Sequence, residues 1–505
     1  MNRSPFTLAA ALVLAGCAGP GATGIDGTDP APTNPAARAG AEMAATGCAD
    51  GAVRSEHRVT IEGRTLAYTA CAGTLTLRDD AGEPLADLFY TAYFAPGETR
   101  AVPRPLTFVW NGGPGADSRL LHFEALGPRV LRDGALVDNP ATPLPASDLV
   151  FLDPADTGFS RARSDAARKR LYSTTGDIAA TRDFIVAFRA AYGRAGSPLF
   201  LVGESFGTWR AAGAAEALAD SGEDVAGIGL VSGGIPLGES DDRALMRALS
   251  LPGRTAAAAA HGKLAGDLMA DPVAAIAAAE RWARATWYPA LADPQGLPDA
   301  ERAQVGAGLA RFHGIAPEAI DPQTLWVSPR DFRTALLADR GQTLDVFDMR
   351  KAGAPDDDPR AEAAILRYYR ESLDVEGGTY AGIEGEALPV GAGWQYDQAP
   401  ITEESLARAL AGEGPPSPSQ PWTLRALRKM PAMRVFVAAG LYDSLNSCAA
   451  NEATVAALPP GAASRIALHC YAGGHMMYDD PAVARLFGAD VSAFLGNSGE
   501  SRDRD

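Results

Sequence analysis

The stretch Leu-Phe-Leu-Val-Gly-Glu-Ser-Phe-Gly, residues 199–207, decides the predicted fold of this 505-residue chain. Its apolar beginning predicts a buried strand. A serine with glycine two positions away on either side is typical of a tight strand-to-helix turn, because only small residues let the strand and the helix approach so closely. Helix formers follow at residues 208–218, and the first N–H groups of that helix would point toward the serine oxygen. Ser205 is therefore the candidate nucleophile, although an ordinary tight turn would give the same short pattern.

The nucleophile needs a base, and in hydrolases with this turn the acid and the base follow the serine in the order Ser, Asp or Glu, His. Four histidines follow Ser205, namely His261, His313, His469 and His475. His475 is favoured because it follows two glycines on a loop after the β-rich residues 465–471, whereas His469 lies inside that strand pattern. Asp443 lies on the loop after the apolar strand predicted at 433–439. We therefore predict a catalytic triad of Ser205, Asp443 and His475.

A glycine-rich loop interrupts a second apolar strand, in the sequence Phe-Val-Trp-Asn-Gly-Gly-Pro-Gly at residues 108–115. Such a loop exposes backbone N–H groups, and acyl transfer passes through an oxyanion that fixed donors stabilise. We predict that the N–H groups of Gly113 and Phe206 form the oxyanion hole. A plain turn between strand and helix is the alternative.

Four sequence blocks resemble the serine carboxypeptidase family of the α/β-hydrolase superfamily. They are Asn-Gly-Gly-Pro-Gly at 111–115, Asp-Pro-Ala-Asp-Thr-Gly-Phe-Ser at 153–160, Gly-Glu-Ser-Phe-Gly at 203–207 and Gly-His-Met-Met-Tyr at 474–478. Leu-Tyr-Asp at 441–443 is similar to bacterial members. The resemblance spans about residues 107–478 and implies the same triad and oxyanion hole. It also implies that the terminal carboxylate of a peptide substrate binds to Asn111, Gly112 and Glu204.

Asn111, Gly112 and Glu204 would form a carboxylate clamp, and Glu204 can bind a carboxylate only under one condition. A glutamate that faces a carboxylate is repulsive unless one of the two groups keeps a proton, so Glu204 must be protonated when substrate binds. A partly buried, like-charged setting raises the pKa of a carboxyl group, and exopeptidase activity is then expected to favour acidic pH.

Some positions depart from the family pattern. Ala116 replaces the cysteine that follows the Asn-Gly-Gly-Pro-Gly block in the best-known eukaryotic members, and Trp110 adjoins Asn111 instead of standing two residues before it. Those members also place a carboxylate-binding glutamate two residues before a Gly-Pro pair. Here Ala125 holds that position and Glu124 is one residue off, so the carboxylate site is expected to be built differently.

The composition limits the class of protein. Hydrophobic residues make up 47% of the chain, enough for a large core, and one elaborated domain fits the length as well as two. The formal net charge of −17 argues against nucleic acid as a partner, because an acidic surface repels phosphate. No histidine and cysteine cluster has zinc-site spacing, and we expect neither a metal nor an organic cofactor.

The N-terminus predicts export. Arg3 precedes the apolar residues 6–14, which are too few to span a bilayer, and Leu-Ala-Gly-Cys follows at 14–17. This resembles the lipobox of bacterial lipoproteins, which implies a signal peptide at 1–16 and acylation of Cys17. We therefore expect a lipid-anchored protein of the bacterial cell envelope that faces the periplasm or the exterior, with a flexible tether at 17–50. An ordinary signal peptide cleaved near a cysteine is the alternative.

The other four cysteines form an even set, which in an oxidising compartment predicts two disulfides. Three pairings are open from the sequence. We favour Cys48 with Cys71 and Cys448 with Cys470, the second of which would tie the Asp443 loop to the strand that leads to His475. Buried reduced thiols are the alternative.

The order of elements predicts an α/β-hydrolase fold with a largely parallel central sheet and a helical lid insertion. The first part of the core is expected at residues 51–235, the insertion at 236–431, the second part of the core at 432–496 and a disordered tail at 497–505. An insertion there would lie above the strand ends and shape the substrate pocket, although a packing role is also open.

These residues predict a serine-type carboxypeptidase that cleaves peptides with a free C-terminus through an acyl-enzyme on Ser205. An esterase or acyltransferase would use the same triad without the carboxylate clamp. A catalytically silent binding protein is the alternative from a different class.

Overall fold

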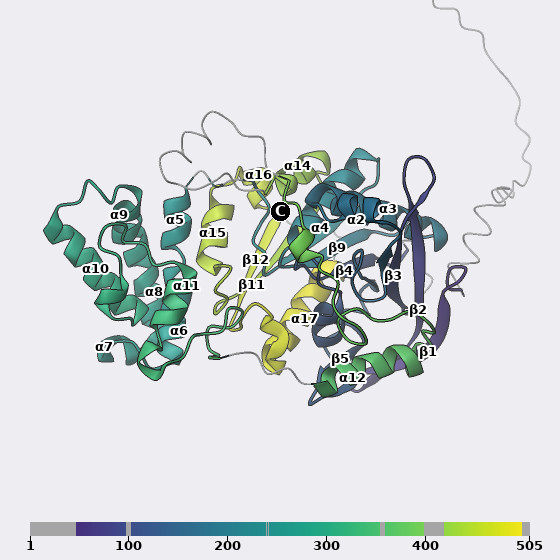
Figure 1. Ribbon diagram of the computed structural model, residues 1–505, viewed down its shortest axis with the longest axis horizontal. Helices are drawn as coiled ribbons and strands as arrows, with labels where there is room; N and C mark the ends of the chain where they lie inside the picture. The colour runs from purple at the N-terminus through teal and green to yellow at the C-terminus, as the bar shows by residue number, and fades with distance from the viewer. Residues whose placement is uncertain are drawn as a thin grey trace, which may run out of the picture.

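The computed structural model describes residues 47–96, 103–238, 240, 242–353, 359–397 and 419–496. The predicted signal peptide, Cys17, most of the tether, the tail and parts of the insertion lie outside these residues. A large sheet forms the centre of the described chain, with the strand order β1-β2-β3-β7-β4-β9-β10-β11-β12 and β8 paired to β3 (Figure 1).

The sheet has an antiparallel beginning and a parallel remainder. The antiparallel strands are β1 (Val53–Ile61), β2 (Arg64–Arg78), β3 (Pro84–Phe94) and β8 (Arg161–Ala162). The parallel strands are β4 (Leu106–Trp110), β7 (Asp148–Leu152), β9 (Leu199–Glu204), β10 (Gly227–Val231), β11 (Arg434–Gly440) and β12 (Ile466–Tyr471). A separate hairpin joins β5 (Arg129–Arg132) to β6 (Ala135–Asp138). This order, with its parallel strands and crossover helices, is an α/β-hydrolase fold, as the sequence predicted.

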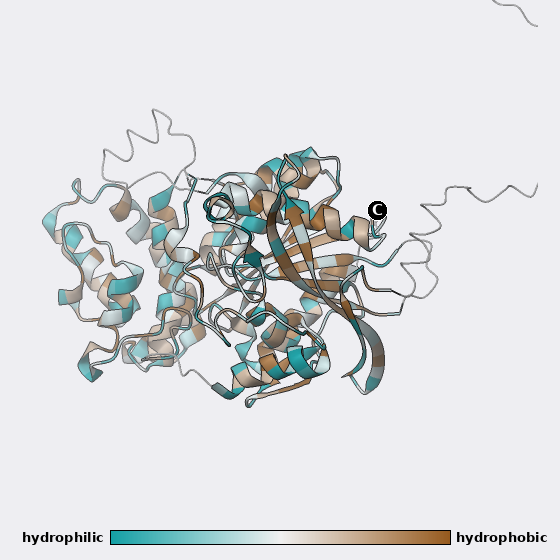
Figure 2. Ribbon diagram, turned by 45° about the vertical axis from the view of Figure 1, so that its right-hand side comes forward, coloured by the Kyte–Doolittle hydropathy of each residue, from teal (hydrophilic) through white to brown (hydrophobic). Residues whose placement is uncertain are grey.

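Helices cover both faces of the sheet. Every residue of β4, β7, β9 and β10 is buried, which is typical of parallel strands with two covered faces. Leu199 and Leu201 of β9 pack in one core cluster with α3 (Thr174–Ala191), α4 (Gly207–Asp220) and α14 (Trp422–Lys429). Phe200 and Val202 point to the other face, where α17 (Pro481–Gly496) and the π-helix η1 (Leu121–Leu126) pack. Figure 2 shows the strands as a hydrophobic layer between these helices.

The insertion after β10 contributes a third core, formed by helices and the loops between them. The helices of the insertion are α5 (Arg243–Ala248), α6 (Leu251–Ala260), α7 (Gly266–Met269), α8 (Pro272–Trp282), α9 (Tyr288–Ala292), α10 (Asp299–His313), α11 (Pro329–Ala335) and α12 (Pro359–Arg367). Apart from α12 they gather beside α15 (Cys448–Ala456), on the left in Figure 1. Trp287 is fully buried in their cluster and Trp282 packs against it, so both tryptophans serve the core of the insertion.

The end of the expected insertion packs differently. Helix α14 lies inside the range 236–431, yet Trp422, Ala426 and Leu427 are buried in the same cluster as α4. Tyr368 and Tyr369, after α12, join the cluster on the opposite face of the sheet. The last part of this range therefore completes the hydrolase core. The remaining α-helices of the described chain, α2 (Asp165–Leu171) and α16 (Pro460–Ala463), are short.

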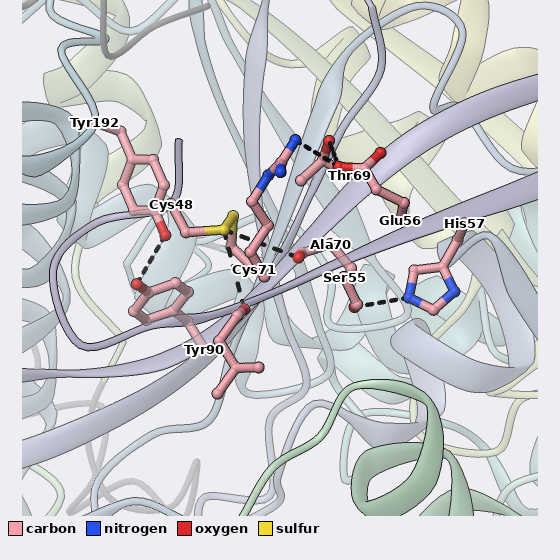
Figure 3. The surroundings of a disulfide bond; sticks show 11 residues. Cys48, Ser55, Glu56, His57, Thr69, Ala70, Cys71, Tyr90 and Tyr192 are labelled. Atoms are coloured by element: carbon pink, nitrogen blue, oxygen red, sulfur yellow. Dashed lines mark hydrogen bonds and ion pairs between the residues drawn. A yellow bond between two sulfur atoms is a disulfide. The ribbon is translucent and has the colours of Figure 1, made fainter. Parts of the chain in front are cut away.

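Two disulfides join the pairs that the sequence favoured. Cys48, just before β1, is bonded to Cys71 of β2 (Figure 3). Beside this bond the hydroxyls of Tyr90 and Tyr192 lie 2.8 Å apart and connect β3 to the end of α3. Cys448, the first residue of α15, is bonded to Cys470 of β12.

Candidate active site

Ser205 lies in a strained turn between β9 and α4. Its φ of 57° is in the left-handed region, which costs free energy for a residue other than glycine and is found at functional sites. A Cβ on Gly203 would lie 2.0 Å from the carbonyl oxygen of Gly207, so the turn closes only with glycine there. The Ser205 N–H donates to the Val231 carbonyl at 2.8 Å, which fixes the turn against β10. This geometry is that of a nucleophile elbow.

Asp443 and His475 meet in loops after neighbouring strands. The imidazole Nδ1 of His475 lies 2.8 Å from Asp443 Oδ2, and each residue is only 3% exposed. The three loops with Ser205, Asp443 and His475 follow the carboxyl ends of parallel strands, which all face one edge of the sheet. In the described chain Ser205 makes no side-chain hydrogen bond to His475, and such contacts commonly tighten only when substrate binds.

The main chain of His475 is held on both sides. Its carbonyl accepts a hydrogen bond from Ser232 Oγ at 2.6 Å, and its N–H donates to the carbonyl of Phe347, also at 2.6 Å. Ser232 follows β10 and Phe347 belongs to the insertion, so core and insertion together fix the base. Neither contact has a local sequence signal, because each partner is more than a hundred residues from His475.

Two opposing effects act on the pKa of His475. Burial favours the neutral imidazole, but the hydrogen bond and charge of Asp443 and the charge of Glu204 outweigh it and raise the pKa above its ordinary value. Burial also raises the pKa of Asp443. Asp443 thus orients the imidazole and stabilises its protonated form, as a triad acid must.

The glycine loop lies directly against the elbow. A Cβ on Gly112 would lie 2.5 Å from the backbone nitrogen of Phe206, and Gly113 has a φ of 97° that favours glycine. Within the described residues the N–H groups of Gly113 and Phe206 donate to no protein acceptor. The Phe206 ring packs between Trp209 and Trp394, with ring centres 5.3 and 5.2 Å away, which fixes its backbone. Two fixed donors are therefore available beside the nucleophile.

A buried carboxyl group lies next to this machinery. Glu204 is 2% exposed, its Oε1 accepts from Asn111 Nδ2 at 2.9 Å, and its Oε2 accepts from the Tyr478 hydroxyl. Burial raises the pKa of Glu204 to about 7, and the charge of His475 with these two hydrogen bonds opposes the rise only in part. The buried Arg210 donates to the Asn111 carbonyl at 2.7 Å and keeps this residue in place. Tyr478 was not singled out from the sequence, although it ends the block that contains His475.

Glu124 reaches the same region through an irregular helix. It lies in η1, a π-helix, which holds more residues per turn than an α-helix and so accommodates an extra residue. Burial and the negative charges of Asp479 and Glu204 raise the pKa of Glu124 to about 7. Glu124, which lies one residue before the position of the family's glutamate, is therefore close enough for the charge of Glu204 to act on it. Ala125, which holds that position, is buried in the core.

The other three histidines that follow Ser205 make contacts away from the Asp443–His475 pair. His469 lies in β12 with Nδ1 3.2 Å from Asp490. His313 is buried in the insertion, and burial with the charge of Arg254 lowers its pKa well below the ordinary value. His261 Nε2 lies 2.9 Å from the Met349 carbonyl oxygen. His475 is thus the histidine that the structure pairs with the predicted acid.

A strained serine, two free backbone donors and a buried Asp–His pair are features typical of serine hydrolases with an α/β fold. Residues 65–226 match the family model described as serine carboxypeptidase. The resemblance expected from the sequence is confirmed over this segment, about a third of the chain. Fold and family match together support a hydrolase or peptidase role.

Solved structures with similar folds are distant in sequence. A prohormone-processing carboxypeptidase from Saccharomyces cerevisiae is 14% identical, with 84% of this chain and 91% of that chain covered and a TM-score of 0.45. A proline iminopeptidase from Mycobacterium smegmatis is 15% identical, with 85% and 98% covered and a TM-score of 0.35. A haloalkane dehalogenase loop variant from Bradyrhizobium elkanii is 14% identical, with 88% and 97% covered and a TM-score of 0.34. No curated protein matches the sequence significantly.

Proposed function

We propose that this protein is a serine-type carboxypeptidase that removes C-terminal residues from peptides. The observation that carries the proposal is the buried carboxyl of Glu204, which shares hydrogen bonds with Asn111 and Tyr478 beside the Asp443–His475 pair. A protonated glutamate can donate to a substrate carboxylate, and the amide of Asn111 can donate to the same group. An esterase would have no use for a protonatable carboxyl at this position.

The proposed chemistry follows the usual acyl-transfer sequence. His475 takes the proton of the Ser205 hydroxyl as the oxygen bonds to the scissile carbonyl carbon, and Gly113 and Phe206 donate to the resulting oxyanion. The C–N bond then breaks as His475 gives its proton to the leaving nitrogen. In the second half, His475 takes a proton from water, the water oxygen attacks the ester carbon, and the proton returns to Ser205 as the acid product leaves.

The acid dependence of peptide cleavage follows from Glu204. Because the pKa of Glu204 is about 7, the group is neutral below that pH and becomes a carboxylate above it. The ionised form repels the substrate carboxylate, so cleavage of free-acid peptides falls as the pH rises through about 7. An ester substrate without a carboxylate needs no such proton, and its hydrolysis continues above pH 7 with neutral His475.

The test compares a blocked dipeptide with a free C-terminus, its C-terminal amide and a simple blocked ester from pH 4 to 8. Cleavage of the free acid by wild type is expected to decline as the pH rises above about 7, and Ser205→Ala is expected to be inactive on all three. Glu204→Gln, which is neutral at every pH, should show a smaller decline of free-acid cleavage above pH 7 than wild type. Preference for the amide or the ester would instead indicate an esterase or acyltransferase, and failure of Ser205 to react with a fluorophosphonate would indicate a silent binding protein.

We also propose that Glu124 completes the carboxylate clamp as a second protonated carboxyl, supported by its pKa of about 7 and its proximity to Glu204. Replacement by glutamine should keep the Michaelis constant for free-acid peptides within about threefold, because the amide still donates one hydrogen bond. Alanine should raise it by about tenfold and leave ester hydrolysis unchanged. Equal effects on the two substrates would assign Glu124 a purely structural role.

For localisation we propose a lipid anchor on Cys17, supported by the sequence at residues 14–17. In the described chain no helix is long and apolar enough to cross a bilayer. Metabolic labelling with a fatty acid analogue should mark the full-length protein and not Cys17→Ala. Labelling of both would overturn the assignment.

A further inference from the structure

A loop of the insertion crosses the two loops that hold Asp443 and His475. We call residues 344–353 the strap. Its ends are held together by the Asp345 N–H, which donates to the Lys351 carbonyl at 3.0 Å, and by a bridge between Leu344 and Ala352. The strap lies outside residues 65–226, the segment that matches the family model.

The strap backbone is fixed at the active site by several short hydrogen bonds. Besides the bond from the His475 N–H to the Phe347 carbonyl, Ser444 Oγ donates to the Val346 carbonyl at 2.6 Å. The N–H of Met349 donates to the Tyr442 carbonyl at 2.9 Å. The N–H groups of Phe347 and Asp348 both donate to Asp345 Oδ1 at 2.8 Å. The backbone of Phe347 is therefore fixed beside His475, although the strap has no helix or strand of its own.

The Phe347 ring is an exposed apolar surface beside the catalytic base. It is 36% exposed, whereas His475 is 3% exposed, and the two ring centres lie 5.4 Å apart. A single exposed apolar side chain is ordinary on a protein surface. This one differs because it contacts the imidazole that must reach the leaving group.

The leaving residue of a substrate must connect two fixed points. Its carboxylate binds at Asn111 and Glu204, and its nitrogen receives the proton of His475. The Cα of the leaving residue would then lie between the carboxylate site and His475. Its side chain would extend beside the imidazole. We infer that Phe347 packs against the side chain of the residue that is released, so that the enzyme prefers peptides with an apolar C-terminal residue. This inference rests on the proposed carboxypeptidase activity.

The test uses two blocked dipeptides that share the first residue and end in leucine or glycine. Glycine has no side chain to contact Phe347. Phe347→Ser should therefore lower kcat/KM about tenfold for the leucine substrate, mainly through KM, and change the glycine substrate less than about twofold. Phe347→Leu retains an apolar contact and should keep most of the preference for leucine.

Two results would overturn the inference. An equal loss on both dipeptides, mainly in kcat, would show that Phe347 acts only by positioning His475. An unchanged leucine-to-glycine ratio in Phe347→Ser would show that the ring does not contact the leaving residue. Leu486→Ser, which changes an exposed residue of α17, is the control and should alter neither substrate. Failure of the proposed function itself is recognised separately, because wild type would then cleave neither free acid while it could still hydrolyse an ester.

Discussion

Tyr478 shows how one residue outside the triad can set the working pH range. Its hydroxyl donates to Glu204 Oε2, and this hydrogen bond favours the ionised form of the glutamate. It therefore keeps the pKa of Glu204 lower than burial alone would. In the proposed mechanism this charge must be absent when substrate binds, so Tyr478 would limit the pH range of activity on the alkaline side.

Removal of this hydroxyl gives a prediction of definite sign. In Tyr478→Phe the pKa of Glu204 should rise, because the ionised form loses a donor, and the decline of free-acid cleavage should move to higher pH. A hydrogen bond to a charged group corresponds to a shift of about one pH unit. The measurement is kcat/KM against pH for the free-acid dipeptide, with a blocked ester as the control. A shift to lower pH, or an equal shift for the ester, would contradict this role of Tyr478.

Sequence reasoning located the conformations that depend on a local turn. The strained conformation of Ser205 could be predicted because it requires Gly203 and Gly207 nearby in the chain. The position of Tyr478 could not, because its partner Glu204 is 274 residues away and a tyrosine after a histidine loop has no distinctive pattern. The same limit applies to Ser232 and Phe347, which hold the main chain of His475 from distant elements.

At the scale of elements, the strap and the His475 loop must pack backbone against backbone. A Cβ on Gly474 would lie 2.5 Å from the Phe347 carbonyl oxygen and 2.6 Å from the Cβ of Asp348. Glycine is therefore needed at position 474 because the two segments approach so closely. Its backbone conformation does not require glycine, because its φ is not in the left-handed region.

Substitution of this glycine should reduce catalysis more than it reduces folding. In Gly474→Ala one of the two segments must move, and a displacement of about 1 Å at a catalytic group can cost about a hundredfold in rate. We expect kcat to fall by about that factor for peptide and ester alike. Gly461→Ala is the matched control, because a Cβ there meets nothing within 4 Å and the variant should retain wild-type rates. Full activity of Gly474→Ala would contradict the tight contact.

Strands of the sheet could be predicted from the sequence, whereas the π-helix η1 and the packing of α14 could not. The strands predicted from the start of the 199–207 stretch and from residues 433–439 overlap β9 and β11, because continuous apolar residues predict strands that are covered on both faces. The π-helix η1 could not be foreseen, since it has no sequence signal apart from the one-residue offset of Glu124. Helix α14 was assigned to the insertion by its place in the chain, whereas its packing on α4 depends on tertiary contacts.

At the scale of the whole molecule, the buried carboxyl groups link stability to pH. The pKa of Glu204 is about 7 in the folded protein, while an unfolded glutamate ionises near its ordinary value of 4.5. Between these values the folded state holds the proton and the unfolded state does not. The contribution of Glu204 to the free energy of unfolding is therefore fully present below about pH 4.5 and is lost as the pH rises to about 7.

Comparison of Glu204→Gln with wild type tests this contribution, because the groups that titrate independently of Glu204 are the same in both proteins. The unfolding midpoint of the variant minus that of wild type should increase by a few degrees from pH 4.5 to pH 7.5. Thermal unfolding at several pH values, followed by circular dichroism, measures it. A difference that stays constant with pH would show that Glu204 is ionised already in acid.

The strap has a consequence for how this enzyme could diversify. Segments that connect the elements of a core commonly vary in sequence more than the core itself. Here the insertion supplies the carbonyl that holds the main chain of His475, so its exchange for another sequence would also alter the geometry of the proposed active site. New substrate preferences should therefore arise by single substitutions at the tip of the strap, where residue 347 can change its side chain while its backbone bond remains.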